Sequence, residues 1–87
     1  MGYKVIMTRT AYKAYQKTTG KLKRGLDRCL SYLSLNPSFG SGIRKLKGHP
    51  GCYRYQVGGL RMVYEVNEDI SEVRVYSIRP RGDVYKH

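Results

Sequence analysis

The segment RYQVGGLRMVYEV, residues 54–66, constrains the fold most, because apolar and polar side chains alternate on both sides of a Gly-Gly pair. A glycine pair between two alternating segments is typical of a tight β-hairpin turn. With Gly58 and Gly59 as the central residues of the turn, the cross-strand register follows. The predicted pairs are Val57 with Leu60, Gln56 with Arg61, Tyr55 with Met62 and Arg54 with Val63.

Successive side chains of a strand point to opposite faces, so this hairpin has one apolar and one polar face. The apolar face collects Tyr55, Val57, Leu60, Met62, Tyr64 and Val66, and we expect it to be core. The polar face collects Arg54, Gln56, Arg61, Val63 and Glu65. No helix is left over to cover this second face, where two arginines repel each other unless an anion lies between them. An ordinary solvated face is the alternative.

The other elements follow from apolar periodicity. Residues 3–7 alternate and predict a strand, and Thr8 or Thr10 caps a helix that ends near Gly20. The apolar stripe of a second helix consists of Leu22, Leu26, Cys29, Leu30 and Leu33. Residues 36–42, which begin with Asn-Pro, end that helix and form a loop, and a last strand is expected over residues 72–78.

This order of elements predicts one α+β domain over residues 1–87. We expect two N-terminal helices packed on one face of a mostly antiparallel four-stranded sheet, in the order β-α-α-β-β-β. Cys29 and Cys52 lie in apolar patterns without the spacing of a zinc site, so we expect both to be small buried hydrophobes. A redox or metal role for them is the alternative.

The chain is strongly basic, with 17 Lys and Arg against 6 Asp and Glu and a net charge of +11. Asp27 is the one acid before Glu65, so the excess charge belongs to the folded domain. Such a domain attracts polyanions, which makes nucleic acid the leading partner class, and a merely solubilising charge is the alternative. The sequence has neither an apolar run long enough to span a membrane nor a secretory signal, so we expect a cytoplasmic protein.

Further cations lie close to the hairpin in the sequence. Lys45 and Lys47 precede it, Arg79 and Arg81 follow the last strand, and Tyr85 lies four residues beyond. Guanidinium groups bind phosphate oxygens and an aromatic ring stacks on a base, as nucleotide binding requires. The last strand contains two alternating sets of side chains, with Val73, Val75, Ser77 and Arg79 on one face and Arg74, Tyr76 and Ile78 on the other. Both sets include apolar residues, so the sequence alone leaves two alternatives for the face that Arg79 joins.

The segments NPSFGSGIRKLKGHPGCYRYQVGGLRMVYEV and VYSIRPRGDVY resemble the RelE family, within the RelE/ParE superfamily of bacterial toxins from type II toxin-antitoxin systems. The shared pattern is an Asn-Pro loop, KLKG, an aromatic-basic strand, a turn, R-x-V-Y-E-V and a closing basic run that ends in V-Y. The resemblance covers essentially the whole chain. It implies a microbial-RNase-like α+β fold, cleavage of messenger RNA in the ribosomal A site without a cofactor, and inhibition by an antitoxin protein.

The resemblance also implies roles for single residues. Arg61 matches a phosphate-binding arginine, and Arg79 or Arg81 matches an arginine that stabilises or protonates the leaving oxygen. Tyr85 matches a tyrosine that orients or stacks on the substrate. Basic residues that contact the RNA backbone are matched by Lys45 and Lys47.

The first hairpin strand departs from the family pattern, which has a lysine pair where this chain has Arg54 and Gln56. We expect Arg54 to act among the catalytic cations and Gln56 to bind substrate by hydrogen bonds. Attack of a 2'-hydroxyl on the adjacent phosphorus also calls for a proton acceptor, and arginine does not deprotonate near neutral pH.

The candidates for this base are Glu65, His49 and His87. Each has a plainer interpretation: Glu65 as a salt-bridge partner, and the two histidines as ordinary loop or terminal residues. A further alternative is that no base is needed, because alignment on the ribosome and electrostatic stabilisation supply the rate.

Two other functions compete with RNA cleavage. A ParE-like toxin of the same fold inhibits DNA gyrase by protein contact, without catalysis, and it has no need of arginines around an aromatic ring. A non-catalytic RNA-binding module fits the charge alone. We expect the antitoxin to bring acidic residues or a helix over the arginine face, or to displace Tyr85 and the tail.

Overall fold

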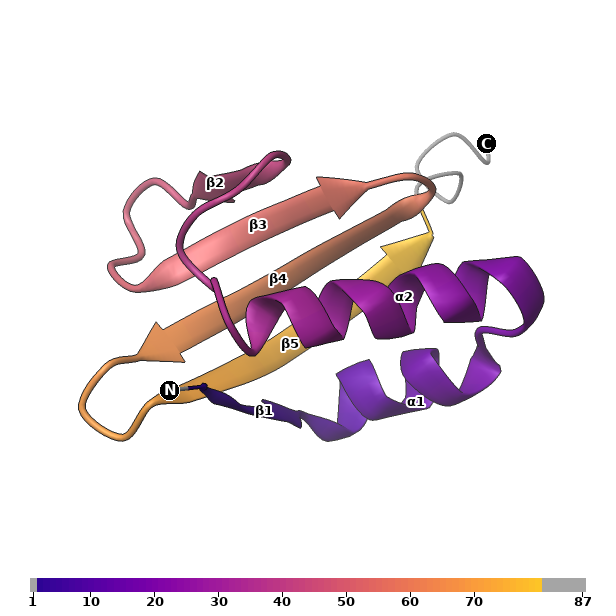
Figure 1. The fold of residues 1–87 in the computed structure, drawn as a ribbon, viewed down its shortest axis with the longest axis horizontal. Helices are drawn as coiled ribbons and strands as arrows, with labels where there is room; N and C mark the ends of the chain where they lie inside the picture. Colours follow the sequence, from indigo (N-terminus) through magenta and orange to yellow (C-terminus); the bar gives the residue numbers. More distant parts are fainter. Residues whose placement is uncertain (1, 81–87) are drawn as a thin grey trace.

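In the computed structural model, which describes residues 2–80, a strand and two helices precede four further strands (Figure 1). The elements are β1 Lys4–Met7, α1 Arg9–Lys17, α2 Gly20–Leu33, β2 Ile43–Lys45, β3 Cys52–Val57, β4 Leu60–Asn67 and β5 Glu72–Pro80. None of the helices within this range is long and apolar enough to cross a membrane. The predicted order of helices and strands is therefore confirmed, except that the structure has five strands where four were expected.

The strands form one sheet in the order β1-β5-β4-β3-β2. The pair β1 and β5 is parallel, and the other three pairs are antiparallel. The expected number of four strands is one short, because β2 is a separate strand paired with the edge of β3. Its three residues are too few to show a period, so only the pairing with β3 identifies them as a strand.

The β3–β4 hairpin has the register that the sequence predicts at all four pairs. Gly58 has a φ of 55° and allows the tight turn, as expected of a glycine at a position that side chains disfavour. The apolar face is buried at Tyr55, Leu60, Met62, Tyr64 and Val66. The side chain of Val57 lies outside the described part of the structure.

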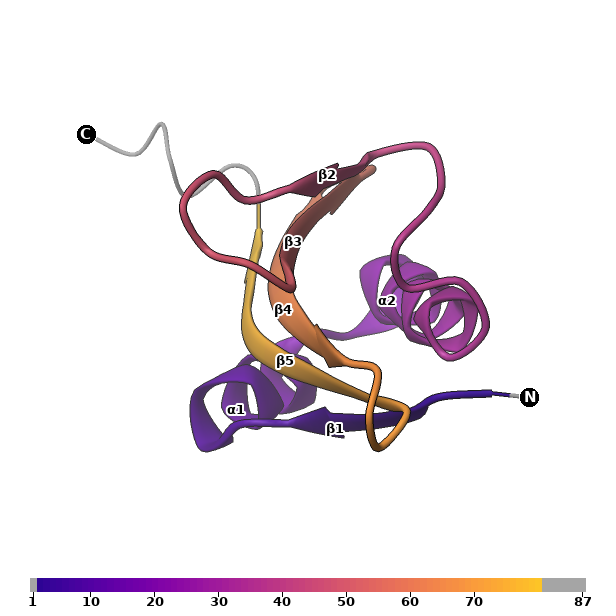
Figure 2. The same cartoon turned by 90° about the vertical axis from the view of Figure 1, so that its left-hand side faces the viewer.

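Local capping and an apolar stripe account for the helices. The N-cap of α1 is Thr8, whose side chain accepts a hydrogen bond from the Ala11 N–H at 3.2 Å. In α2 the buried residues are Leu26, Cys29 and Leu33. Helix α2 lies over one face of the sheet, whereas α1 runs beside β5 beyond the end of β1 (Figures 1 and 2).

A buried tyrosine ties the loop after α2 to the sheet. The hydroxyl of Tyr64, on the central strand β4, donates a hydrogen bond of 2.6 Å to the carbonyl oxygen of Pro37. Burial raises the pKa of this hydroxyl, so it stays a neutral donor. The Tyr64 ring also stacks on Tyr53 of β3, with ring centroids 5.7 Å apart. The loop is thereby held against the face of the sheet that α2 covers.

Candidate nucleic-acid interface

The face of the sheet opposite α2 carries the cations of the hairpin. We call it the open face and define it by Arg44, Arg54, Gln56, Arg61, Val63, Glu65, Arg74, Ser77 and Arg79. Its central row crosses three strands, because Arg61 on β4 pairs with Gln56 on β3 and with Arg79 on β5. The neighbouring Met62 and Ile78 are buried in the core, so Arg61 and Arg79 lie on the other face.

The next row adds two more arginines. Arg54 on β3 pairs with Val63 on β4, and on its other side it pairs with Arg44 on β2. Arg44 was not among the residues expected at the site. It follows the half-buried Ile43, and this alternation of an apolar and a charged residue is the signal that would have predicted Arg44 on the open face. Predicted RNA contact at Lys45 finds no support in the register, because Lys45 pairs with Tyr53, which packs against the core.

A β-bulge determines the face that Arg79 joins. Val63 pairs with Ser77 and Tyr64 pairs with Val75, so Tyr76 is an extra residue on β5. An extra residue reverses the alternation of the strand beyond it. Valines on one side of the bulge and Ile78 on the other are therefore all buried in the core, and Arg79 stands on the open face beside Arg61. Neither of the two alternating patterns considered from the sequence is correct over the whole strand.

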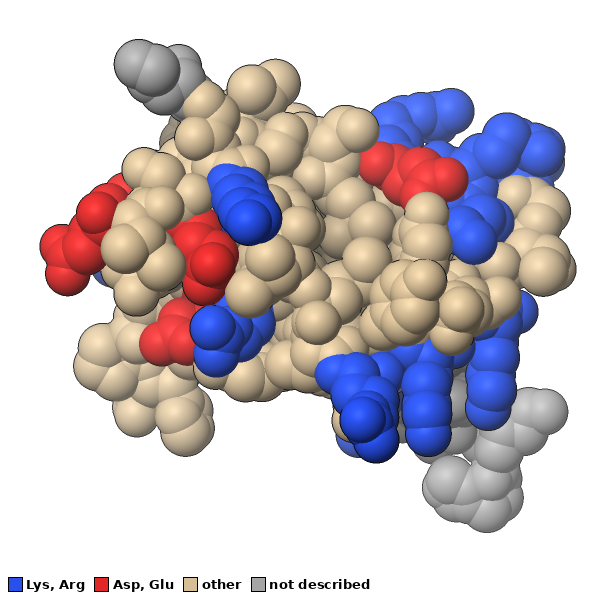
Figure 3. Space-filling model, turned by 90° about the horizontal axis from the view of Figure 1, so that it is seen from below, with Lys and Arg blue, Asp and Glu red and all other residues tan. Residues whose placement is uncertain are grey.

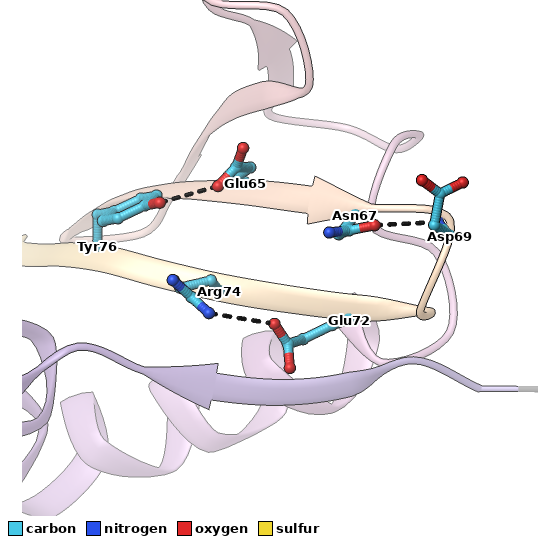
Figure 4. Close-up of polar contacts among 6 residues, drawn as sticks. All are labelled: Glu65, Asn67, Asp69, Glu72, Arg74 and Tyr76. Carbon is cyan, nitrogen blue, oxygen red and sulfur yellow. Dashed lines mark hydrogen bonds and ion pairs between the residues drawn. The ribbon is translucent and has the colours of Figure 1, made fainter.

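Of the five arginines on the open face, only Arg74 has an acidic partner within residues 2–80. In that range the one ion pair joins Arg74 and Glu72, at 3.5 Å between Nη2 and Oε1 (Figure 4). Among the described residues the buried Nε of Arg61 also has no hydrogen-bond partner. A buried donor without an acceptor is uncommon in native structures.

Charge is distributed unevenly over the molecule. In the view of Figure 3 most of the acidic side chains gather towards one end and most of the Lys and Arg towards the other. Three acids, Glu68, Asp69 and Glu72, lie in or beside the β4–β5 connection. The two arginines nearest the opposite end of β4 and β5 are Arg61 and Arg79. This separation directs a polyanion towards the arginine end of the sheet.

Glu65 is engaged with a tyrosine rather than with an arginine. The hydroxyl of Tyr76 donates a hydrogen bond of 2.8 Å to Oε1 of Glu65 (Figure 4). This hydrogen bond is the main reason that the pKa of Tyr76 is raised, while Arg74 opposes the rise. Within the described residues, Glu65 therefore accepts a hydrogen bond from a neutral tyrosine and is not a salt-bridge partner, as the plainer interpretation had it.

The cysteines differ from each other. Cys29 is 7% exposed and is the small buried hydrophobe that was expected. Cys52 pairs with Glu65 at the edge of the open face and is partly exposed, so the expectation of burial is wrong for it. Partial burial is the first cause that raises the pKa of the Cys52 thiol, and the Glu65 carboxylate is the second.

The remaining predicted residues lie at the margin of this face or beyond the described residues. Lys47 and His49 are exposed in the β2–β3 connection, which extends on the side of the sheet opposite α2 (Figure 2). Backbone groups of His49 form the turn, with its N–H bonded to Leu46 and its carbonyl to Cys52. The predicted residues Arg81, Tyr85 and His87 lie outside the described residues.

Arg79 also borders a cleft on the helix side of the sheet. The cleft has a volume of about 650 Å³ and lies between α1, the start of α2 and the paired ends of β4 and β5. Its cationic lining residues are Lys13, Lys17 and Arg79, and Leu60 and Ile78 form part of its apolar floor. Arg79 therefore lies between the open face and this basic cleft.

Comparison with known proteins identifies one family model and several solved structures to which the chain is similar. The family described as "ParE toxin of type II toxin-antitoxin system, parDE" matches residues 5–85. No curated protein sequence matches the chain.

Solved structures share the fold over nearly the whole chain. The archaeal RelE-RelB complex from Pyrococcus horikoshii contains a chain that is 26% identical, with a TM-score of 0.81 and coverage of 94% of this chain and 98% of that one. The isolated Escherichia coli RelE toxin is 28% identical, with a TM-score of 0.78 and coverage of 95% and 90%. For fold alone, a YoeB/ParE toxin from Agrobacterium tumefaciens is 22% identical, with a TM-score of 0.75 and coverage of 88% and 96%.

Proposed function

This chain belongs to the ParE toxin family of type II toxin-antitoxin systems, within the RelE/ParE superfamily, and we propose that it is a ribosome-dependent endoribonuclease that cleaves messenger RNA and so inhibits translation. The observation that carries the proposal is the row Gln56, Arg61 and Arg79 across β3, β4 and β5. Arg61 and Arg79 are paired directly across β4 and β5 there, without an acidic partner among the described residues. A phosphate between them satisfies both groups.

The row supports cleavage by attack of the ribose 2'-hydroxyl on the adjacent phosphorus. In this reaction the O2'–P bond forms, the P–O5' bond breaks, the proton of the 2'-hydroxyl passes to solvent water, and the 5'-oxygen takes a proton from solvent water. Arg61 binds the non-bridging phosphate oxygens and stabilises the charge that develops on the phosphorane. Arg79, or Arg81 beyond the described residues, stabilises the leaving 5'-oxygen. Gln56 contributes hydrogen bonds, and Arg54 in the next row extends the positive field.

No side chain of the central row is a proton acceptor, because arginine stays protonated and glutamine does not titrate. Glu65 lies further along β4, and one of its oxygens already accepts the Tyr76 hydroxyl. We therefore propose that charge stabilisation and alignment supply most of the rate, with the ribosome holding the message in place. Lys47 and Tyr85 are proposed to contact the RNA backbone and the substrate base, as the family resemblance implies.

The experiment is to induce the chain in growing bacteria and to map the 5' ends of translated messages. In-frame cuts within codons are expected, and Arg61→Ala is expected to reduce them about 10²- to 10³-fold, the loss typical of one transition-state donor. Arg24→Ala is the matched control, because Arg24 is an exposed arginine on α2, away from the open face.

The alternative is inhibition of DNA gyrase by protein contact, which the match to the ParE toxin family favours. Uncut messages together with gyrase-linked DNA damage would establish that activity and exclude the endoribonuclease. Message cuts that persist at full level in Arg61→Ala would contradict the role of the central row.

We also propose that an antitoxin protein is the physiological partner and that it presents acidic residues to the open face. Solved structures of similar chains include toxin-antitoxin complexes, such as the archaeal RelE-RelB complex. The four arginines of the open face that have no acidic partner among the described residues offer complementary charge. Arg54→Glu is expected to weaken the complex with the cognate antitoxin at least tenfold, whereas Arg24→Glu on α2 leaves it unchanged. Equal affinities of the two variants would exclude this docking mode.

A further inference from the structure

Tyr76 is an exposed aromatic residue on a cationic surface. It is the extra residue of the β5 bulge, its side chain is 39% exposed, and its hydroxyl reaches Glu65 on the open face. Strand propensity alone accounts for a tyrosine in β5 but not for this orientation. Without the bulge, the regular alternation that buries Val73 and Val75 leaves Tyr76 exposed but turns Arg79 into the core. The bulge brings the ring and Arg79 onto one surface.

The ring is held rather than loose. The hydrogen bond of 2.8 Å to Glu65 crosses from β5 to β4 and fixes the far end of the ring against the neighbouring strand (Figure 4). Arg74 lies near the same hydroxyl and is paired with Glu72. A ring fixed at its polar end loses little conformational freedom when a second flat group packs against it.

The distance from the arginine row suits a neighbouring nucleotide. Tyr76 lies between the levels of Val63 and Tyr64, which are two and three residues from Arg61 along β4, or roughly 7–10 Å at about 3.3 Å per residue. The intervening row carries Arg54, Val63 and Ser77. This separation is short enough for an RNA strand with a phosphate at Arg61 and Arg79 to bring a neighbouring base to Tyr76.

We propose that Tyr76 is a nucleobase-stacking platform of the open face and that Glu65 is the positioning residue that holds its ring. The ligand is a single-stranded ribonucleotide segment, with one base stacked on Tyr76 and a neighbouring phosphate at Arg61. This inference rests on the proposed function for the identity of the ligand. Aromatic side chains that stack on splayed bases are the usual means by which proteins bind single-stranded RNA.

The test uses the full chain and a short single-stranded RNA that carries 2-aminopurine, a base analogue whose fluorescence is quenched by stacking. The wild-type chain is expected to quench the probe, and Tyr76→Phe, which keeps the ring but loses its hydrogen bond to Glu65, is expected to quench it less than the wild type but more than a variant without a ring. Tyr76→Leu keeps apolar bulk without an aromatic face, and it is expected to lose the quenching at that position of the probe and to weaken binding about 5- to 150-fold.

Two further variants separate stacking from other effects. Glu65→Gln keeps an oxygen acceptor for the Tyr76 hydroxyl and is expected to retain the quenching, whereas Glu65→Ala reduces it. Tyr12→Leu is the matched control, because Tyr12 is a 49% exposed tyrosine on α1, and its loss is expected to leave the probe unaffected.

The outcomes separate this inference from the proposed function. RNA binding that is lost in Arg61→Ala but unchanged, with full quenching, in Tyr76→Leu would overturn the stacking platform and leave the endoribonuclease intact. Quenching that depends on Tyr76 in a chain that cuts no message would support the nucleobase site and overturn the endoribonuclease. A wild-type chain that neither binds nor cuts RNA would overturn both.

Discussion

Arg61 on β4 lies directly opposite Arg79 on β5, on the face of the sheet that α2 does not cover. Like charges placed opposite each other on neighbouring strands are destabilising, by roughly 0.2–1 kcal/mol. Within residues 2–80 neither arginine has an acidic partner that would offset the repulsion. This arrangement disfavours the free protein slightly and favours any state in which an anion lies between the two groups.

The first prediction concerns this repulsion. Arg79→Gln is expected to increase the free energy of unfolding by a few tenths of a kcal/mol to about 1 kcal/mol, because it removes one of two facing charges. It is expected at the same time to reduce message cleavage. Urea unfolding at low ionic strength measures the first effect, with Arg24→Gln on α2 as the control. A variant less stable than the wild type would contradict the repulsion.

Salt dependence provides a second prediction. If Arg61 and Arg79 share one phosphate and Arg44 and Arg54 each contact one more, the logarithm of the RNA affinity falls with the logarithm of salt concentration with a slope of about −2, at roughly −0.7 per phosphate for single strands. Arg54→Ala is expected to make that slope shallower by about 0.7. Binding titrations between low and moderate salt measure it. An unchanged slope in this variant would mean that Arg54 contacts no phosphate.

A third prediction concerns the edge of the site. Gly42 has a φ of 86°, and a Cβ at this position would collide with the backbone carbonyl oxygen of Gln56. Gly48 has a φ of 77° but open space around it, so it is the matched control. Gly48→Ala is expected to cost about 1–2 kcal/mol from backbone strain alone. Gly42→Ala is expected to cost more, because it also displaces the strand that carries Gln56. Equal losses in thermal or urea unfolding would exclude the contribution of that contact.

The fourth prediction is an alkaline loss of stability. Burial, with the Cys29 thiol as a lesser cause, raises the pKa of Tyr55 from 10.0 to about 12. Above pH 10 the unfolded chain releases this proton while the folded chain retains it, so stability falls as the pH rises from 10 towards 12. Two pKa units correspond to a loss of at most about 2.7 kcal/mol.

Tyr55→Phe removes this contribution to the alkaline loss. The variant is expected to lose less stability than the wild type between pH 9.5 and pH 11.5 in urea unfolding (a range of about two units around the ordinary pKa). Tyr12→Phe, at an exposed tyrosine on α1, is the control and is expected to follow the wild type. Parallel curves for Tyr55→Phe and the wild type would contradict the pKa shift.

The hairpin could be predicted from the sequence because its information is local. The Gly58-Gly59 pair sets the turn, and a side-chain period of two then assigns Arg54, Gln56 and Arg61 to one face without knowledge of the rest of the chain. The helices follow similarly from a capping residue and an apolar stripe. These elements, and the hairpin's share of the candidate site, are therefore encoded within short segments of the chain.

The bulge at Tyr76 and the pairing of β2 depend instead on contacts between segments distant in the sequence. In the sequence, the extra residue of β5 shows only as a conflict between two alternating patterns of apolar side chains. Pairing with β4 resolves the conflict, because it buries Val75 and Ile78 on the same face of the sheet. Only the tertiary structure thus brings Arg79 beside Arg61, adds Arg44 to the open face and turns Tyr76 towards Glu65. The sequence alone determined which residues the hairpin exposes, because the alternation of side chains is a property of a single strand. The tertiary structure decided which other side chains join them on the open face, because register depends on the pairing of two strands.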